Sequence, residues 1–306
     1  MVVLRAAVLK PLDHAKFLAS PTKAELVEFV VALNKSCFGR RTAHGEISAR
    51  IASILRGVAD KVDDFPARGD NRRFGDAAFR DWHAWLVASS VTLVAPLAGD
   101  AAAAEIALYL SASFGDPQRL DYGTGHETAF VVFLLCLWRC GVLPASEVTD
   151  GAVVLVAFEA YSDACRLVQT RYALEPAGSR GVWALDDYQC LLFLFGSSQH
   201  CGAGNAPAAY VDLAGLRLLP DDDTLFAQGL RFAAACKKGA PFFESSPILF
   251  ALAKKPWHLV NNHIFDYYDK EVLGNFVVAR HLLFGDLFPA TWLTGAGNSS
   301  SSSRRA

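Results

Sequence analysis

The sequence lacks an excess of charge of either sign, and it also lacks a long apolar run. Its 306 residues carry 29 basic and 31 acidic side chains, which gives a formal net charge of −2. Such a balance provides no basic field for nucleic acid or for an anionic membrane, so any anion site must be local. The longest uncharged interval, 188–211, is broken by glycines, serines and a proline and is not expected to span a membrane.

Several well-known catalytic motifs are absent as well. The His-Glu pair at 126–127 is not followed by a second histidine at position 130, which excludes a metalloprotease helix. Gly123 and Gly125 are not followed by a third glycine at the right spacing, which excludes a Rossmann turn. The chain has no Walker A motif and no Gly-x-Ser-x-Gly motif, so neither a P-loop nor a serine-hydrolase triad is proposed.

Cysteine is present but scattered. The seven cysteines lie mostly in apolar surroundings, which is typical of free buried thiols in a reducing compartment. Cys136 and Cys140 lie one helical turn apart, but no second pair at ligand spacing accompanies them, so zinc is not expected. The first 18 residues carry dispersed charges and no secretory pattern. We therefore expect a soluble, cytoplasmic protein, with a nuclear pool as a further expectation.

Helical periodicity dominates the chain, 52% of which is hydrophobic. Residues 127–143 are apolar almost all round, which predicts a helix at the centre of the core. No sustained β alternation occurs, so the predicted class is all-α, with one large domain over 1–292 and a disordered Ser-rich tail over 293–306. Further helices are predicted at 24–38, 45–63, 100–114, 152–173, 188–195, 222–238, 257–269 and 270–282.

The segment 119–127 reads Arg-Leu-Asp-Tyr-Gly-Thr-Gly-His-Glu and carries the strongest functional signal. Thr124 and Glu127 have the spacing of a capping box, which predicts a helix start. A helix start presents unpaired N–H groups and the positive end of the helix dipole, and both favour an anion. Arg119 could add a bidentate contact to a phosphate. The alternative is a well-capped core helix without a ligand.

A second unusual segment, 175–189, carries a loop rich in proline and glycine that leads to Trp183 and two adjacent carboxylates. Such loops are more often functional than purely connecting. Asp186 and Gln189 have the spacing of another helix cap, which leaves Asp187 free to bind Mg²⁺. One carboxylate is a weak magnesium site unless phosphates share the ion. Nearer the C-terminus, the Arg-His pair at 280–281 could also reach an anion, although such pairs are common on surfaces.

Together these segments resemble the phosphotyrosyl phosphatase activator family, the activators of protein phosphatase 2A. The resemblance runs in order from about residue 22 to residue 289 and rests chiefly on the two segments just described. The matching stretches are 73–82, 119–127, 175–187, 195–199, 239–242 and 257–285.

The resemblance implies an all-helical fold with core, linker and lid parts around a deep cleft. It implies binding to the catalytic subunit of protein phosphatase 2A, with the scaffold subunit as a further partner. It also implies action with ATP and Mg²⁺, and peptidyl-prolyl isomerase activity on a proline-containing peptide. ATP hydrolysis is expected only in complex with the phosphatase. We expect no nucleic-acid or membrane partner, and a monomer or a peptide-induced dimer.

By the same resemblance, particular side chains receive roles. Trp183 and Asp186 are the expected catalytic residues, and Val182 and Trp183 the surface offered to the partner. The expected ATP contacts are Arg119, Thr124, Gly125, Val277, Arg280 and His281, and Gly181 and Asp187 are expected at the magnesium. Isomerisation of an X–Pro bond meets a barrier of about 18–20 kcal/mol, which an apolar pocket can lower without a nucleophile. The alternative function is a non-catalytic, chaperone-like binding module for the phosphatase.

Overall fold

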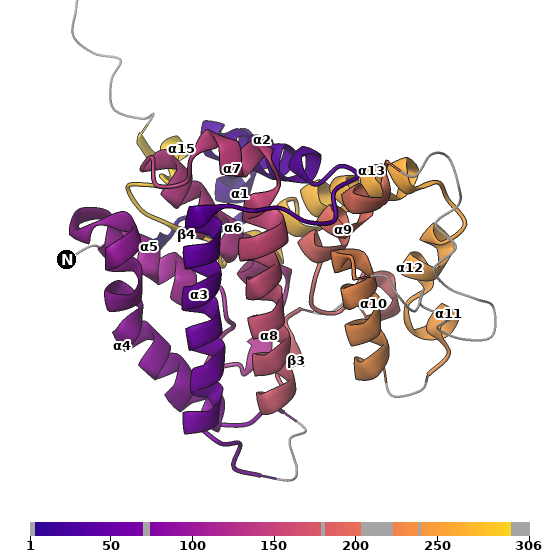
Figure 1. Cartoon of the computed structure of the whole chain (residues 1–306), viewed down its shortest axis with the longest axis horizontal. Coiled ribbons are helices and arrows are strands. Elements are labelled where there is room, and N and C mark those ends of the chain that lie inside the picture. The colour runs from indigo at the N-terminus through magenta and orange to yellow at the C-terminus, as the bar shows by residue number, and fades with distance from the viewer. Residues whose placement is uncertain (1–3, 70–73, 179–180, 203–222, 238–239, 295–306) are drawn as a thin grey trace, which may run out of the picture.

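The computed structural model describes residues 4–69, 74–178, 181–202, 223–237 and 240–294. These residues form helices almost throughout, and each strand among them is two residues long, so the all-α prediction is confirmed (Figure 1). The α-helices are α1 Pro11–Leu18, α2 Pro21–Ser36, α3 Glu46–Asp60, α4 Ala78–Ala98, α5 Asp100–Ala112, α6 Thr124–Arg139, α7 Ala145–Thr149, α8 Glu159–Tyr172, α9 Leu191–His200, α10 Leu225–Cys236, α11 Phe242–Ser245, α12 Pro247–Leu252, α13 Trp257–Tyr267, α14 Phe276–Ala279 and α15 Thr291–Thr294.

Tighter and wider helical turns complete the chain. The segments Lys61–Asp64 and Gly181–Trp183 are 3₁₀ turns, and Val153–Phe158 and Tyr268–Leu273 are π-helical. The π-helical turn at Val153–Phe158 leads directly into α8, and together they cover the helix predicted at 152–173. The predicted tail lies, from residue 295 on, outside the described residues.

Helix α6 lies at the centre of the molecule, as its all-round apolar sequence predicts. Residues 130–137 are all buried, and α5 packs along the helix. The ring of Phe130 stacks on that of Tyr161 of α8 with 3.9 Å between centroids. One apolar core extends from α2 to α14, so helices on both sides of Figure 1 share it. The central helix therefore fixes the position of its own first turn, where the candidate site lies.

The start of α6 differs from the prediction. The helix begins at Thr124 with Gly123 as its N-cap, so Thr124 does not cap it. The Glu127 side chain does not bond to the start of its own helix either. Its carboxylate accepts the first N–H groups of α9, from residues 190–192, at 2.8, 2.8 and 3.0 Å. The predicted capping box is therefore wrong, because Glu127 caps a different helix.

The predicted start of α9, at residue 188 with Asp186 as its cap, is also wrong. Asp186 accepts the N–H groups of Tyr188 and Gln189, both at 3.0 Å, in a turn that precedes the helix. Since Glu127 supplies the acceptors for the helix itself, α9 begins at Leu191, later than the spacing predicts. Asp186 stabilises the preceding turn and does not cap α9.

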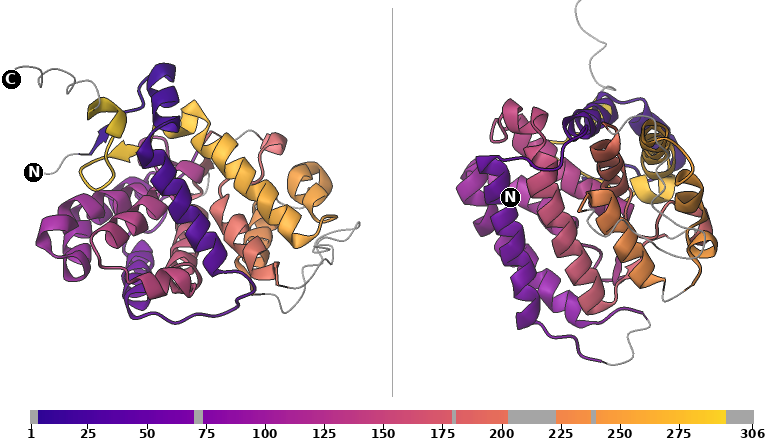
Figure 2. Two further views of the ribbon diagram at one scale, coloured as in Figure 1. Left: turned by 90° about the horizontal axis from the view of Figure 1, so that it is seen from above. Right: turned by 45° about the vertical axis from the view of Figure 1, so that its right-hand side comes forward.

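Two short strand pairs join distant parts of the chain. Strand β1 (Arg5–Ala6) pairs antiparallel with β4 (Leu283–Phe284), near the two ends of the described chain (Figure 2). Strand β2 (Asp121–Tyr122) pairs in parallel with β3 (Glu175–Pro176). The second pair aligns the two segments that the sequence singles out.

Some properties expected of the whole molecule can be compared with the structure. All seven cysteines are free, and four of them are buried. Within the described ranges, every helix is too short or too polar to traverse a lipid bilayer. The predicted helix over 270–282 is interrupted, because the π-helical turn ends at Leu273 and α14 begins only at Phe276. The Asn275 side chain caps α14 by accepting the N–H of Val277 at 3.0 Å.

Candidate functional site

A cavity of about 550 Å³ lies at the first turn of α6. Its walls come from the end of α5, the loop 115–121, residues 177–178 and the segment 275–283. Cavities of this volume are typical of small-molecule sites. Five of the six residues predicted to contact ATP line it, namely Arg119, Thr124, Gly125, Val277 and His281. Segments more than 150 residues apart in sequence therefore meet at one site, which we call the nucleotide cavity after the ligand that the sequence predicts for it.

The sixth residue predicted to contact ATP lies differently. Arg280 is exposed, and its guanidinium carbon lies 6.0 Å from the centre of the Phe276 ring. It does not line the cavity. A role for Arg280 at the site stays a prediction, because its long side chain would have to turn toward the cavity to reach a ligand there.

The loop between α5 and β2 holds its polar side chains in a tight turn. The N–H of Asp116 donates to the carbonyl of Asp121 at 3.0 Å, and the Asp116 Oδ1 accepts the N–H groups of Gln118 and Arg119 at 2.8 and 2.9 Å. Leu120 has a φ of +56°, a left-handed conformation that costs a residue with a Cβ about 1–2 kcal/mol. Such strain is common at functional sites, and here it places Arg119 and Asp121 on the same side of the loop.

Arg119 lies between two carboxylates. Its Nη1 is 2.8 Å from Asp116 Oδ2, and its Nε is 2.8 Å from Asp121 Oδ2. Burial opposes both charges, but the hydrogen bonds and ion pairs outweigh it: the pKa of Arg119 is raised, and the pKa of Asp116 is lowered. The guanidinium is thus fixed in place, and a phosphate would have to share it with these acids.

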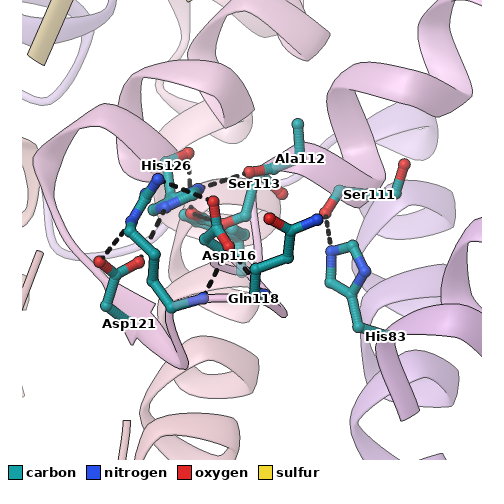
Figure 3. Close-up of polar contacts among 10 residues, drawn as sticks. His83, Ser111, Ala112, Ser113, Asp116, Gln118, Asp121 and His126 are labelled. Carbon is teal, nitrogen blue, oxygen red and sulfur yellow. Dashed lines mark hydrogen bonds and ion pairs between the residues drawn. The ribbon is translucent and has the colours of Figure 1, made fainter. Parts of the chain in front are cut away.

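Two histidines of the cavity have defined tautomers. His126 Nδ1 lies 2.7 Å from the carbonyl of Ala112, and His83 Nε2 lies 3.1 Å from the carbonyl of Ser111 (Figure 3). Because a carbonyl can only accept, each of these nitrogens must donate, which leaves the other ring nitrogen as an acceptor. Burial lowers the pKa of both rings, and also that of His281, so the neutral forms are favoured.

The glycines at the start of α6 have different roles. A Cβ on Gly123 would lie 3.0 Å from the Cβ and 3.1 Å from the carbonyl oxygen of Ala177, so this glycine permits close packing of the two segments. A Cβ on Gly125 would only touch Val278, at 3.4 Å. Among the hydrogen bonds of the described residues, the N–H groups of Thr124 and Gly125 have no acceptor. Those two groups are available to an anion in the cavity.

The loop 181–187, called the Trp183 loop here, forms the second part of the predicted site. Trp183 is 78% exposed and lies on a 3₁₀ turn beside α11 and α12. Gly181 is exposed, with a φ of +57° that favours glycine. The side chain of Val182 lies outside the described part of the structure. Burial raises the pKa of Asp186, although the two N–H groups that it accepts act in the opposite direction.

The two residues predicted at the magnesium do not line the nucleotide cavity. The Asp187 carboxylate forms an ion pair with Lys237 at the end of α10. Gly181 contributes no side chain. Within the described residues, no group of three or more histidine, cysteine or acidic side chains is arranged to hold a metal ion.

Glu127 physically connects the nucleotide cavity to the Trp183 loop. It belongs to the first turn of α6, directly after His126, and it caps α9, which begins just beyond Asp187. Burial raises the pKa of Glu127 to about 7, while the three N–H groups act to lower it. The two segments thus lie close together, although Asp187 does not line the cavity and is paired with Lys237.

The sequence did not reveal three residues that line the cavity, Asp116, Asp121 and His126, or the role of Glu127 in capping α9. Asp116 and Asp121 lie three and two residues from Arg119 in the sequence, so the acidic residues near this arginine could have indicated the site. His126 was considered only as a metal ligand. That Glu127 caps α9 depends on a contact between residues 63 positions apart, which no local pattern reveals.

Comparison with known proteins places the chain in a family. A family model described as "Phosphotyrosyl phosphate activator (PTPA) protein" matches residues 4–290. The chain therefore belongs to the phosphotyrosyl phosphatase activator family, and the resemblance drawn from its motifs is confirmed.

Individual relatives support the same family assignment. "Serine/threonine-protein phosphatase 2A activator 1" of Schizosaccharomyces pombe is 34% identical over 293 residues, which cover 92% of this chain and 89% of the relative. "Serine/threonine-protein phosphatase 2A activator 2" of Yarrowia lipolytica is 35% identical and covers 92% and 81%, respectively. The crystal structure of "the PP2A phosphatase activator Ypa1 PTPA1" matches with a TM-score of 0.77 at 25% identity, over 94% of this chain and 96% of that one.

Proposed function

We propose that this chain activates protein phosphatase 2A by binding its catalytic subunit, with ATP held in the nucleotide cavity. The activator role follows from family membership and from relatives of nearly the same extent. The nucleotide role is supported by one observation above all. Five residues singled out for ATP come from two segments far apart in the sequence and line a single cavity.

The cavity has the features that a nucleotide needs. Its volume of about 550 Å³ suits a ligand of that size. The Arg119 guanidinium and the two N–H groups at the start of α6 can donate hydrogen bonds to phosphate oxygens. Asp121 also presents a buried carboxylate oxygen without a hydrogen-bond partner, which a donor group of a ligand could satisfy. ATP offers both kinds of group.

A magnesium ion fits only if the phosphates of the nucleotide supply part of its ligands. No cluster of acidic side chains in the described residues could hold it alone, and Asp187 is paired with Lys237. Mg²⁺ commonly binds through one or two carboxylates together with substrate phosphates. We propose that Asp187 contributes one oxygen when Lys237 moves away, and that Gly181 lets the loop approach the ion.

The chain's own residues would act chiefly by positioning. Bound ATP with Mg²⁺ would supply a triphosphate that carries the metal ion. Arg119 would orient the phosphates, with its own direction fixed by Asp116 and Asp121. Val277 and His281 would close the opposite wall. The Trp183 loop would present its exposed indole, together with Val182, to the phosphatase.

Prolyl isomerase activity belongs to the same proposal. Trp183 could remove water from an X–Pro bond, but only once a partner or peptide covers an indole that is 78% exposed in the chain alone. Asp186 would act by fixing the loop, because its carboxylate accepts two backbone N–H groups. No nucleophile is needed, since rotation about the bond forms no covalent intermediate.

The same exposure favours a second candidate function. A largely exposed tryptophan is typical of a hot spot for protein binding and does not by itself make an enclosed pocket for catalysis. The chain would then be a non-catalytic binding module for the phosphatase. A proline-peptide isomerisation assay separates the two: the enzyme loses its catalysed rate on Trp183→Ala, whereas the binding module shows no catalysed rate at all.

A pull-down tests the proposed function. The immobilised catalytic subunit of protein phosphatase 2A, alone and with its scaffold subunit, should retain the wild-type chain more strongly when ATP and Mg²⁺ are present. Arg119→Ala should abolish that increase and leave the nucleotide-free binding unchanged. Equal retention with and without ATP would contradict the nucleotide role, and no retention at all would contradict the partner. Cytoplasmic localisation, and either a monomer or a peptide-induced dimer, are part of the same proposal.

A further inference from the structure

We propose that a second copy of this chain docks on the exposed face of α4, with the two α4 helices packed antiparallel about a two-fold axis. The inference is independent of the proposed function, because α4 carries none of the residues expected to contact ATP, magnesium or the phosphatase. Unlike the peptide-induced dimer, this pair forms from the chain alone.

The solvent-exposed face of α4 is apolar over most of its length. Val87 and Val91, which lie one helical turn apart, are 45% and 43% exposed. The other side chains of this face are exposed or half-buried, namely Ala84, Ala88, Thr92 and Ala95. These positions follow the i, i+3, i+4, i+7 spacing with which one helix packs against another. We call these six residues the α4 face.

No charge interrupts the α4 face. From residue 82 to residue 99 the sequence contains no acidic residue, and its only basic residue is His83, which is buried and bonds to the carbonyl of Ser111. The surface side of a helix in a soluble protein normally carries charged residues. An uncharged apolar face of this length is typical of a surface that contacts another protein.

The position of α4 leaves this face accessible in the described part of the structure. The helix packs on α5, α3 and α8, and its buried side chains, such as Trp82 and Leu86, belong to the core. Figure 1 shows α4 at the edge of the molecule, away from α10, α11 and α12. Because the Trp183 loop lies beside α11 and α12, a second copy on the α4 face leaves that loop free.

The α4 face is nearly symmetric about the middle of the helix. In an antiparallel pair centred between residues 89 and 90, the two copies meet with Ala84 opposite Ala95, Ala88 opposite Val91, and Val87 opposite Thr92. No two valines lie directly opposite each other, so the helices can approach closely. A symmetric dimer requires one surface that is complementary to itself, and the α4 face meets this requirement.

Charges at the two ends of α4 favour a second copy as the partner and set the orientation of the pair. Arg80 lies one turn before Ala84, Asp100 lies just beyond the other end of the helix, and both charged residues are exposed. In the centred antiparallel pair, Arg80 of each copy lies within one residue of the position opposite Asp100 of the other. A parallel pair would instead bring like charges together at both ends. Among the described residues, Asp100 has no ion pair, and the Arg80 guanidinium donates only to the carbonyls of Pro117 and Gln118.

The contact is small, so the association should be weak. Residues 84–95 span about three helical turns, less than a standard interface, and we expect a dissociation constant on the order of 10–100 µM. The chain is then a monomer in dilute solution and a dimer at high concentration. The equilibrium should not depend on ATP, Mg²⁺ or a proline-containing peptide.

Sedimentation velocity of the full chain, without nucleotide or peptide, tests the proposal. Between about 1 and 300 µM the wild-type chain should change from monomer to dimer. Val91→Glu places a charge inside the contact in both copies and should weaken the association by at least about 10-fold. A wild-type chain that stays monomeric over the whole range would overturn the proposal, and so would undiminished dimerisation of Val91→Glu.

Leu167→Glu is the matched control. Leu167 of α8 is 41% exposed, compared with 43% for Val91, and it also lies on the surface of a helix. Neither change should affect folding, which circular dichroism verifies. The control adds the same charge as Val91→Glu and should dimerise as the wild type does. Loss of the dimer in both variants would assign the effect to net charge and overturn the role of the α4 face.

An exchange of charges tests the antiparallel orientation. Arg80→Glu and Asp100→Arg each replace two attractive pairs with two repulsive ones, and each alone should weaken the dimer about 3- to 10-fold. Mixed in equal amounts, the two variants should associate about as tightly as the wild type, because unlike charges again face each other at both ends. Single variants that dimerise like the wild type, or a mixture no tighter than either variant alone, would contradict the antiparallel pair.

Discussion

The nucleotide cavity and the Trp183 loop are built from adjoining segments, yet their side chains are held in opposite ways. In the cavity, Arg119 is fixed between two carboxylates, and His126 is anchored to a backbone carbonyl. In the loop, Trp183 is 78% exposed. A rigid, enclosed arrangement suits a small ligand, and a large exposed aromatic suits a protein surface.

The contrast suggests that the two regions of the fold bind different ligands. The cavity lies on the central helix α6, so its geometry is fixed by the core. The loop depends on the start of α9, whose first N–H groups are bound by Glu127 of α6. A ligand at the first turn of α6 and a partner at the loop would therefore affect the same short connection. Variants that change one region and leave the other intact test whether the two regions act independently.

The largest effect is expected from Glu127→Ala, which removes the connection. Three N–H groups at the start of α9 would lose their acceptor inside the core, which should cost about 3–5 kcal/mol in the free energy of unfolding. Denaturant unfolding measures the loss. Glu127→Gln keeps the shape and one acceptor oxygen, so its loss should be smaller. A loss below about 1 kcal/mol in the alanine variant would show that the cap contributes little.

Trp183→Ala should affect the loop alone. We expect affinity for the phosphatase catalytic subunit to fall about 30-fold, as for a tryptophan hot spot, with ATP affinity and stability unchanged. Phe38→Ala, which removes another exposed aromatic, is the control and should leave phosphatase binding intact. Surface plasmon resonance with the phosphatase, and calorimetry with ATP, provide the two measurements. A parallel loss of ATP binding in Trp183→Ala would argue against two separate regions.

The cavity should also show a distinct dependence on pH. Burial lowers the pKa of His126 below 6.5, so the unfolded chain binds a proton at a higher pH than the folded chain does. Stability is therefore lost as pH falls below about 6.5, by at most about 1.4 kcal/mol per pH unit for one such group. His126→Asn can still donate to the Ala112 carbonyl but cannot be protonated. Its stability relative to wild type should improve as pH falls from 7 to 5; a constant difference would contradict the buried neutral ring.

The smallest effect is expected at the predicted magnesium ligand. Asp187→Asn should reduce the gain in ATP affinity that Mg²⁺ gives by less than about 10-fold, because the phosphates carry most of the coordination. Affinity for ATP without Mg²⁺ should not fall. Lys237→Ala removes the competing cation from Asp187 and should change the Mg²⁺ effect in the opposite direction. Identical Mg²⁺ effects in all three proteins would remove Asp187 from the site.

The sequence predicted the class of fold, the central helix and five of the residues that line the cavity. Those predictions depend on local signals: the all-round apolar pattern of α6, and the glycines and arginine before it. The helix starts were less predictable. The spacing from Thr124 to Glu127 matches a capping box, but the tertiary contact with α9 gives Glu127 a better set of donors.

Other features could not be read from the sequence for a similar reason. The acceptor role of His126 depends on which carbonyl its other nitrogen reaches, and the pairing of Asp187 depends on the position of Lys237 on α10. Both are contacts between elements distant in sequence. The parallel pairing of β2 with β3 is two residues long and leaves no alternating pattern to detect.

Hydrogen exchange followed by mass spectrometry, with and without ATP and Mg²⁺, tests most directly whether the cavity holds the nucleotide. We predict slower exchange in peptides covering 116–126 and 275–283, which form its walls. Peptides containing Trp183 should change only when the phosphatase is added. Unchanged exchange at both wall segments under saturating ATP, or protection confined to the Trp183 loop, would contradict binding of the nucleotide in this cavity.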